Sequence, residues 1–417
     1  MNVESFHCAD APRETTFCKQ RGGDYGYAIM TKWHTCKLGD LLQIKHGFAF
    51  LGEYFGRSGT HVVLTPGNFH EEGGFKEKID KAKWYKGPIP NDYILREGDL
   101  IVAMTEQAEG LLGSSAIIPR SGFYLHNQRL GLVQIRDRKL ADQRFIYYLF
   151  NSKPVRQQIR ASASGTKIRH TAPSRIADVK VSVPPLPVQR RIAGILSAYD
   201  ELIENSQRRI RILEEMARAL YREWFVHFRF PGHENHPLTS SSLGDIPQGW
   251  EVKKLGDVVI LNYGKALKKE NRCNGVYPVY GSSGIVGMHD TSLVKGPGII
   301  VGRKGNVGSI FWCDDDFFVI DTAYFVTSYL PLRYLFYVLP TMNFINSDAA
   351  VPGLSRNQAY TLEILVPPAA LLKKFCELAG TFESQASTLQ RQIQNLRLTR
   401  DYLLPKLLAG DVKLKEN

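Results

Sequence analysis

Two stretches of the chain carry a long heptad pattern of apolar residues, here called the heptad stripes. The first stripe advances in alternating steps of four and three residues with one polar member: Ile192, Leu196, Tyr199, Ile203, Ser206, Ile210, Leu213, Ala217, Leu220 and Trp224. The second stripe repeats these steps with one charged member: Phe375, Ala379, Phe382, Ala386, Leu389, Ile393, Leu396, Arg400, Leu403 and Leu407. This spacing predicts two long helices, each with one apolar face that needs a partner helix.

Each predicted helix has about 37 residues and a length of ~55 Å at 1.5 Å per residue. Ordinary globular helices average ~11 residues, so we expect the two stripes to pack on each other. A parallel pair would place both globular regions at one end, and an antiparallel pair would place one at each end. We predict the antiparallel pair. The alternative is that each helix lies separately on its own domain.

The segments that precede the two helices repeat one another. WHTCKLGDLL at 33–42 matches WEVKKLGDVV at 250–259. VKVSVPP at 179–185 matches LEILVPP at 362–368, and each predicts a short strand ended by a proline pair. Chance recurrence of common turn sequences is the alternative to duplication. We favour a duplication with the order globular domain, helix, globular domain, helix.

The predicted fold class is therefore mixed α+β, with two globular domains, a pair of long antiparallel coiled-coil helices and a pseudo-twofold internal repeat. The predicted organisation runs from one end of the chain to the other: an N-terminal extension at 1–30, expected to be disordered, a first globular domain at 31–185, a long helix and linker at 186–236, a second globular domain at 237–368, a C-terminal helix at 369–410 and a tail at 411–417.

Composition and charge limit the class of protein. The chain has 417 residues, 43% hydrophobic and 23% charged, as in ordinary globular proteins. It contains no run of 18 apolar residues, and we expect no membrane contact. The N-terminus lacks a signal-peptide pattern and the six cysteines form no C-x-x-C pair, which predicts reduced thiols and a cytoplasmic location.

The net charge of +12 predicts an acidic partner, most simply nucleic acid. The excess is concentrated in the first half: residues 31–187 hold 23 basic and 14 acidic side chains, whereas residues 237–366 hold 11 of each. We therefore expect contacts of the second domain with an anion to depend on the placement of a few side chains.

Signatures of catalysis are absent from the sequence. It has no P-loop, no H-E-x-x-H and no G-x-S-x-G motif. Asp245, Glu251 and Lys253 resemble a nuclease motif only loosely, and two of them belong to the repeated segment. His227, His233 and His236 have the spacing of no standard metal site. We assign no catalytic residue, no metal and no cofactor to this chain.

Gly-rich loops and polar runs supply candidate DNA contacts. Arg can form two hydrogen bonds with guanine, Asn can form two with adenine, and Lys can bind phosphate. In the second domain the candidates are Lys265, Lys268, Ser282, Ser283, Arg303, Lys304, Asn306, Arg356 and Asn357. In the first domain they are Lys45, His46, Thr105, Glu106, Gln107, Lys167, Arg169 and His170. Solvated turns are the alternative, since the same residue types are common there.

The order of these segments resembles a type I restriction-modification specificity subunit. The resemblance covers residues 31 to about 410 and is carried by the repeated W-x3-KLGD segments, VYPVYGSSGIVG, VGRKGNVGS, VPPLPVQRRIAGILSAYDELIENSQRRI and REWFVHFRFPG. It implies two target-recognition domains, each reading half of a split double-stranded DNA target. The helix pair would set the gap and dock two modification subunits that use S-adenosylmethionine to methylate adenine. Restriction subunits would add cleavage that uses ATP and Mg.

One departure from that family concerns the start of the second helix. VPPAALLKKF stands where the first copy has VPPLPVQRRI, so Gln189 has no counterpart, and we expect weaker docking at that end. Two other functions stay open from the residues alone. One is a diverged DNA-modifying enzyme with unrecognised motifs, and the other is a coiled-coil scaffold that binds protein and not DNA.

Overall fold

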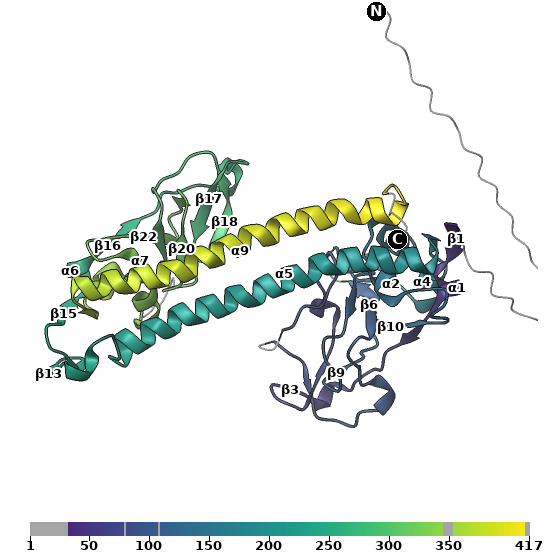
Figure 1. The fold of residues 1–417 in the computed structure, drawn as a ribbon, viewed down its shortest axis with the longest axis horizontal. Helices are drawn as coiled ribbons and strands as arrows, with labels where there is room; N and C mark the ends of the chain where they lie inside the picture. Colours follow the sequence, from purple (N-terminus) through teal and green to yellow (C-terminus); the bar gives the residue numbers. More distant parts are fainter. Residues whose placement is uncertain (1–31, 79–80, 107–108, 345–352, 413–417) are drawn as a thin grey trace, which may run out of the picture. The chain divides into compact units, whose positions relative to one another are not determined.

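The computed structural model describes residues 32–78, 81–106, 109–344 and 353–412 (Figure 1). It divides into two compact units, the first formed by Met1–Ser197 with Tyr402–Asn417 and the second by Ala198–Asp401. The predicted extension at 1–30 lies outside the described residues. Among the described residues, no helix is long and apolar enough to cross a membrane.

The first unit is built around a four-stranded antiparallel sheet in the order β2-β10-β6-β8. Its strands are β2 (Leu42–His46), β6 (Leu100–Ala103), β8 (Ser115–Ile117) and β10 (Leu130–Ile135). A second four-stranded sheet has the order β3-β5-β4-β9, with β3 (Phe55–Gly56), β4 (His61–Val63), β5 (Trp84–Tyr85) and β9 (Tyr124–Leu125). Every residue of β6 is buried, because this strand is covered on both faces.

Two short pairs of strands and four short helices complete the first unit. β1 (His34–Lys37) pairs with β12 (Lys180–Val183), and β7 (Thr105–Glu106) pairs with β11 (Arg169–His170). The helices are α1 (Leu38–Leu41), α2 (Gln143–Phe150), α3 (Lys153–Ala161) and α4 (Pro173–Ala177). As the alternating sequence predicts, β12 turns its valines inward and its polar residues outward.

The second unit repeats this plan around the sheet β16-β22-β19-β20. Its strands are β16 (Val259–Tyr263), β19 (Gly298–Gly302), β20 (Ile310–Cys313) and β22 (Ala323–Ser328). β15 (Glu251–Lys254) pairs with β23 (Glu363–Val366) as β1 does with β12. The short helices are α6 (Leu255–Val258), α7 (Leu332–Val338) and α8 (Arg356–Tyr360).

Other strands distinguish the second unit from the first. A three-stranded sheet has the order β18-β17-β21, with β17 (Tyr277–Gly281), β18 (Gly284–His289) and β21 (Phe318–Val319). Ahead of β15, the chain forms a hairpin of β13 (Leu238–Ser241) and β14 (Gly244–Pro247).

The duplication is visible in the element bounds. β1, α1 and β2 recur with unchanged spacing as β15, α6 and β16, and α4 and β12 recur in the same way as α8 and β23. The two long helices, α5 (Leu186–Tyr221) and α9 (Ala369–Ala409), each begin directly after a proline pair. The predicted α+β fold with an internal repeat is confirmed.

The two long helices run antiparallel within the second unit. Arg400 of α9 donates from Nη1 to the Asp200 carboxylate of α5 at 2.6 Å. Near the other end of α5, the rings of Tyr221 and Phe375 lie 6.4 Å apart. Residue numbers therefore rise along α5 as they fall along the facing part of α9, and Figure 1 shows the same antiparallel course (teal and yellow).

Each unit buries the start of one long helix and the end of the other. In the first unit, Ile192 and Leu196 share a buried cluster with Leu407. In the second unit, Phe375 shares one with Tyr221 of α5 and with two residues of the π-helical turn (Arg222–Val226) that follows α5. The antiparallel pairing is confirmed, and the alternative of two helices lying separately on their own domains is wrong.

The heptad stripes coincide with the covered faces of both helices. All twenty stripe positions are buried or half-buried, including the polar Ser206 and the charged Arg400. Apolar residues outside the stripes, such as Leu202, Ile212 and Met216, are about half exposed. The heptad spacing thus predicted both the two helices and the face of each helix that is covered.

Removing the Arg400–Asp200 ion pair should reveal its role in the helix pair. Both side chains are less than a third exposed, at 23% and 29%. Arg400→Leu removes the guanidinium that contacts the half-buried Asp200 carboxylate, and we expect a loss of ~1–2 kcal/mol in the free energy of unfolding. The double variant Arg400→Leu with Asp200→Leu should recover most of that loss, because neither charge then remains.

Urea unfolding followed by circular dichroism measures both values. Arg397→Leu is the matched control, since Arg397 is exposed on the same helix. Equal midpoints for Arg400→Leu and Arg397→Leu would show that the ion pair contributes nothing to the helix pair.

Candidate nucleic-acid interface

The predicted DNA-contact residues of the second unit gather where β16 and β19 end and β22 begins. Arg303 and Lys304 follow β19, and both donate their backbone N–H to the carbonyl of Thr322, at 2.9 and 3.0 Å. Ser282 donates its backbone N–H to the hydroxyl of Thr322 at 3.4 Å. Thr322 therefore connects the two Gly-rich loops that the sequence singled out.

A third segment, which comes from later in the chain, joins this sheet end. Lys304 forms a β-bridge with Gly353, and Leu354 donates its N–H to the carbonyl of Arg303 at 2.8 Å. Ser355 then caps α8 by accepting from the N–H of Gln358, which places Arg356 in the first turn. Ser282, Arg303, Lys304 and Arg356 are thus brought together from three separate loops.

The other predicted residues of the second unit lie around this group with fewer fixed contacts. Lys265, Lys268, Ser283, Asn306 and Asn357 are exposed. The backbone of Lys265 is held by an N–H bond to Val319 at 2.9 Å, and the carbonyl of Asn306 accepts from the Ser309 hydroxyl at 2.8 Å. Their side chains are free to meet solvent or a ligand. Which of them touch bases stays a prediction.

Tyr263 belongs to this group and was not predicted. It ends β16, is 49% exposed, and its ring carries the guanidinium groups of Arg303 at 4.9 Å and Arg356 at 5.0 Å. The sequence held a signal for it, because aligning the repeated KLGD segments carries the predicted His46 onto Tyr263. Burial raises the pKa of the neighbouring Tyr324 to about 12, and the Tyr324 ring contacts the Tyr263 ring edge to face, with 5.1 Å between the ring centres.

The first unit builds the equivalent sheet end from different side chains. Thr105 and Glu106 of β7 pair with His170 and Arg169 of β11. Thr171 donates its N–H to the carbonyl of Met104 at 2.9 Å, the counterpart of the bond from Leu354 to Arg303. The backbone is the same in the two units, whereas the residues displayed on it differ.

The remaining predicted residues of the first unit fall in three environments. His46 and Lys167 are exposed. Lys45 is half-buried, donates from Nζ to the carbonyl of Asp92 at 2.9 Å and lies 4.6 Å from the centre of the Tyr93 ring. Gln107 lies outside the described residues.

Glu106 requires a correction to the predicted set. Its side chain is only 5% exposed, and its Oε2 accepts from the backbone N–H groups of Gly110, Leu111 and Leu112 at 2.9–3.1 Å. A buried carboxylate that satisfies three loop donors holds the loop in shape. The structure therefore indicates a structural role for Glu106 and not contact with a base.

Gln189 also has a role other than the expected one. It is fully buried, its Oε1 accepts from the Asp142 N–H at 2.9 Å, and its Nε2 donates to the carbonyls of Leu140 and Pro184, both at 2.9 Å. A residue so enclosed offers nothing to a docking partner. The structure therefore gives Gln189 a structural role, and the weaker docking expected at the start of the second helix stays a prediction.

The second unit shows why the glutamine is dispensable there. The residue equivalent to Gln189 is the buried Leu372, and the cap of α7 equivalent to Asp142 is Pro331. Proline has no N–H, so no acceptor is required and an apolar side chain fits. An open groove of about 1030 Å³ lies beside this point, lined by Tyr329, Pro331, Leu372 and Lys373 among others.

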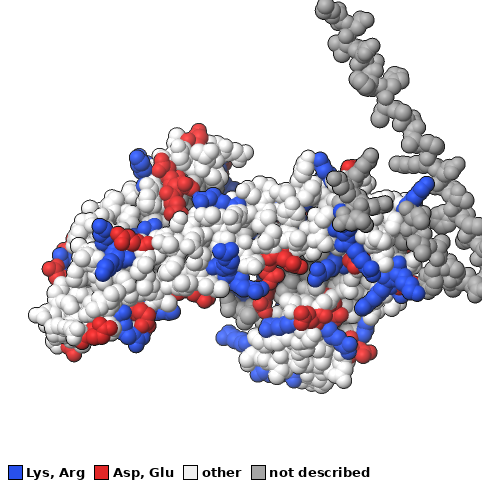
Figure 2. Space-filling model, viewed as in Figure 1, with Lys and Arg blue, Asp and Glu red and all other residues white. Residues whose placement is uncertain are grey.

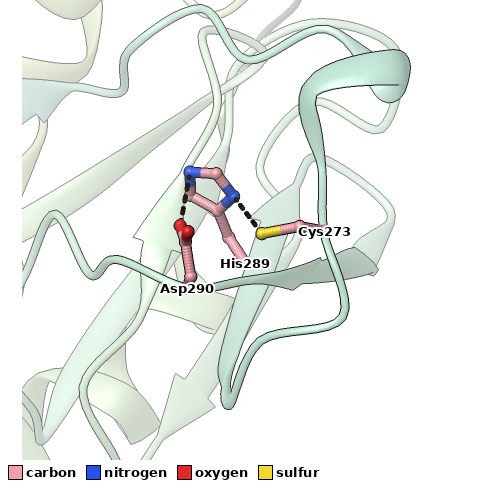
Figure 3. A group of neighbouring side chains, drawn as sticks. All are labelled: Cys273, His289 and Asp290. Carbon is pink, nitrogen blue, oxygen red and sulfur yellow. Dashed lines mark hydrogen bonds and ion pairs between the residues drawn. The ribbon is translucent and has the colours of Figure 1, made fainter.

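Cys273, His289 and Asp290 form a small cluster at one end of β18 (Figure 3). The Cys273 sulfur lies 3.4 Å from Nδ1 of His289, and the Asp290 carboxylate lies 3.4 Å from Nε2. The imidazole therefore stands between the other two groups, and no single ring nitrogen faces both. One contact is a hydrogen bond and the other is an ion pair when the imidazole is protonated, although the three groups could each offer a ligand atom within 4.8 Å of one another.

Charges of both signs are mixed on the face of the molecule that Figure 2 shows. Figure 2 shows Lys and Arg interspersed with Asp and Glu over the face in view, with broad areas that carry neither. In the second unit, contact with an anion must then depend on individual side chains, as the balanced charge of residues 237–366 predicts.

Comparison with known proteins points in one direction. A family model described as "Type I restriction modification DNA specificity domain" matches the chain twice, at residues 30–215 and 247–394. The specificity subunit of the type I restriction enzyme MjaIX of Methanocaldococcus jannaschii is 26% identical over 311 residues, which cover 65% of this chain and 69% of that protein. A putative type I specificity subunit of Mycoplasma pneumoniae is 22% identical over 363 residues, covering 84% and 88%.

A solved structure shares the fold. The crystal structure of a type I restriction-modification S subunit from M. genitalium superposes with a TM-score of 0.60 at 18% sequence identity, covering 92% of this chain and 97% of that one. At this level of identity the likeness concerns the fold alone.

The enclosed glutamine gives a stability prediction. Gln189→Leu leaves the Asp142 N–H and two carbonyls without their partner, and we expect the free energy of unfolding to fall by ~1–3 kcal/mol. Gln207→Leu makes the same change at a half-exposed position of α5 and should cost much less. Chemical denaturation compares the two, and an equal cost would mean that the Gln189 bonds do not stabilise the first unit.

His126 predicts acid sensitivity of the first unit. Its ring is fully buried, its Nε2 lies 2.9 Å from the Leu130 carbonyl, and burial lowers its pKa from 6.5 to about 4. Between these two pH values the unfolded chain binds a proton that the folded chain refuses, so the free energy of unfolding falls as the pH drops from 6.5 towards 4. When the pH has fallen below both values, the free energy of unfolding has lost ~3 kcal/mol through His126.

His126→Gln keeps a donor for Leu130 and removes the titration. The free energy of unfolding, measured by urea titration from about pH 7.5 to about pH 4.5, should fall less steeply for this variant than for the unchanged protein. Parallel curves would contradict the assignment.

Proposed function

The chain belongs to the family of type I restriction-modification DNA specificity proteins, and from this premise we propose that each of its two recognition domains reads one half of a bipartite DNA target. The two sheet ends are the surfaces that would meet the two half-sites. The helix pair would set the gap between them. The chain itself would make and break no covalent bond.

One observation carries this proposal. The same sheet end is built twice, with the Thr171–Met104 and Leu354–Arg303 hydrogen bonds at equivalent places, yet it displays different side chains in the two copies. A shared frame with divergent donors is what reading two unlike half-sites requires, because backbone geometry positions the domain and side chains distinguish bases.

We further propose that the helix pair docks two modification subunits. Apolar side chains outside the heptad stripes are exposed on both helices: Leu202 at 54%, Ile212 at 49%, Met216 at 45% and Leu398 at 70%. Exposed apolar groups on a helix surface favour contact with another protein. As the family implies, S-adenosylmethionine would bind to the modification subunits, and ATP and Mg would serve restriction subunits in the full cytoplasmic complex.

Adenine-methylation sequencing of the host genome, with and without this gene, tests the reading of DNA. We expect a motif of two half-sites and a fixed gap that disappears with the gene. Replacing residues 250–368 by the same region of another family member should change one half-site only. A motif unaffected by loss of the gene, or two changed half-sites, would contradict the proposal.

The spacing role has a sharper test because the facing residues are known. Residue pairs such as Asp200 and Arg400 lie opposite one another, so deleting 207–213 from α5 and 387–393 from α9 removes one facing heptad from each helix. The pair shortens by ~10 Å, or about three base pairs, without a change of phase. We expect the same half-sites with a shorter gap.

The matched control deletes 207–213 alone. That deletion shifts one stripe against the other, and methylation should be lost or severely reduced. If the double deletion keeps the original gap, the helix pair does not set the spacing.

A further inference from the structure

We infer that Tyr263 is a positioning residue that holds Arg303 and Arg356 as a paired cationic element for the second half-site. This inference rests on the proposed function and specifies the chemistry of one of its two sites. The ligand would be the acceptor groups of double-stranded DNA, either the O6 and N7 of guanine or the phosphate oxygens.

The geometry of the three side chains carries the inference. The guanidinium carbons lie 4.9 Å and 5.0 Å from the centre of the same tyrosine ring. Two like charges on one ring repel each other, and the negative face of the ring offsets part of that repulsion. Stacking also removes rotamer freedom before DNA arrives, so less entropy is lost on binding.

The surrounding backbone fixes each member in place. Tyr263 pairs with Tyr324 across β16 and β22, and their rings meet edge to face at 5.1 Å. Arg303 donates from Nη1 to the Asp321 carbonyl at 2.9 Å. The α8 helix that bears Arg356 is held against β16, because the Leu261 N–H donates to the Tyr360 hydroxyl at 2.9 Å.

The guanidinium groups of Arg303 and Arg356 are available to bind an anionic partner. Within the part of the chain that the structure describes, neither Arg303 nor Arg356 forms an ion pair with a carboxylate. The Tyr263 ring is half exposed, so the cluster reaches solvent. Residues 237–366 have no net charge, so contact with an anion in this domain depends on where individual cations such as these two guanidiniums lie.

The first unit supplies the comparison. His46, Met104 and Pro173 stand at the places of Tyr263, Arg303 and Arg356, so that sheet end has no stacked arginine pair. The same backbone thus tolerates a residue set without the cluster. The two domains therefore differ in how they bind DNA at equivalent points, and the arginine pair belongs to the second half-site alone.

The test replaces cluster residues and records the methylated motif in the host, together with binding of the purified complex to an oligonucleotide bearing that motif. Tyr263→Phe keeps the ring and should keep the motif. Tyr263→Leu removes the ring, and we expect affinity to fall ~10-fold with the second half-site relaxed. Arg303→Met copies the first unit and should act in the same direction. Lys253→Met is the control, since it disrupts another cation–aromatic pair of this unit, with Tyr329.

The outcomes separate the two ligand sources and the two proposals. Loss of one guanine from the motif indicates a base contact, whereas uniform weakening with a shallower salt dependence indicates phosphate. If Tyr263→Leu and Arg303→Met leave the motif and the affinity unchanged, the inference is overturned while the proposed function stands. If the unchanged protein directs no bipartite motif, the proposed function itself fails.

Discussion

The packing of two apolar stripes against each other is the interaction on which the rest of this structure depends. Neither α5 nor α9 is confined to one compact unit, and each unit completes its core with the start of one helix and the end of the other. A long helix exposing such a stripe to water would be unstable, since burial of the stripe supplies most of its stability. The antiparallel pairing is therefore a condition for both domains and not only a link between them.

Polar residues within the stripes add precision to that pairing. Arg400 interrupts an otherwise apolar pattern, and its guanidinium meets Asp200 on the facing helix. An apolar stripe can slide by a heptad at little cost, whereas a half-buried charge pair is satisfied in one register only. The charged residue that interrupts the apolar pattern is thus paired across the two helices in the observed register.

The two copies share their backbone arrangement and differ in the side chains that they expose. The sheet order, the strand pairs that precede each long helix and the hydrogen bonds at the sheet end recur, because backbone pairing depends little on side-chain identity. Enclosed residues differ in matched pairs. Gln189 accepts from Asp142 in the first copy, and Leu372 and Pro331 occupy the same two positions in the second. At the sheet end, the exposed side chains differ between the two copies, whereas an enclosed one such as Glu106 is held by its partners.

The sequence by itself determined the two helices, their covered faces, the repeat and the general location of the polar loops. Heptad spacing and matched offsets are local or periodic signals, and they survive without knowledge of distant contacts. Only the tertiary structure decided which loop residues act together. From the sequence, Glu106 is a candidate surface contact, and only the structure shows that it accepts from three loop amides. Likewise, only the structure shows that Gln189 is enclosed by three backbone partners. Tyr263 acquires its place beside Arg303 and Arg356 only when strands and a helix that are distant in the chain meet, because side-chain contacts across a sheet end leave no fixed spacing in the sequence.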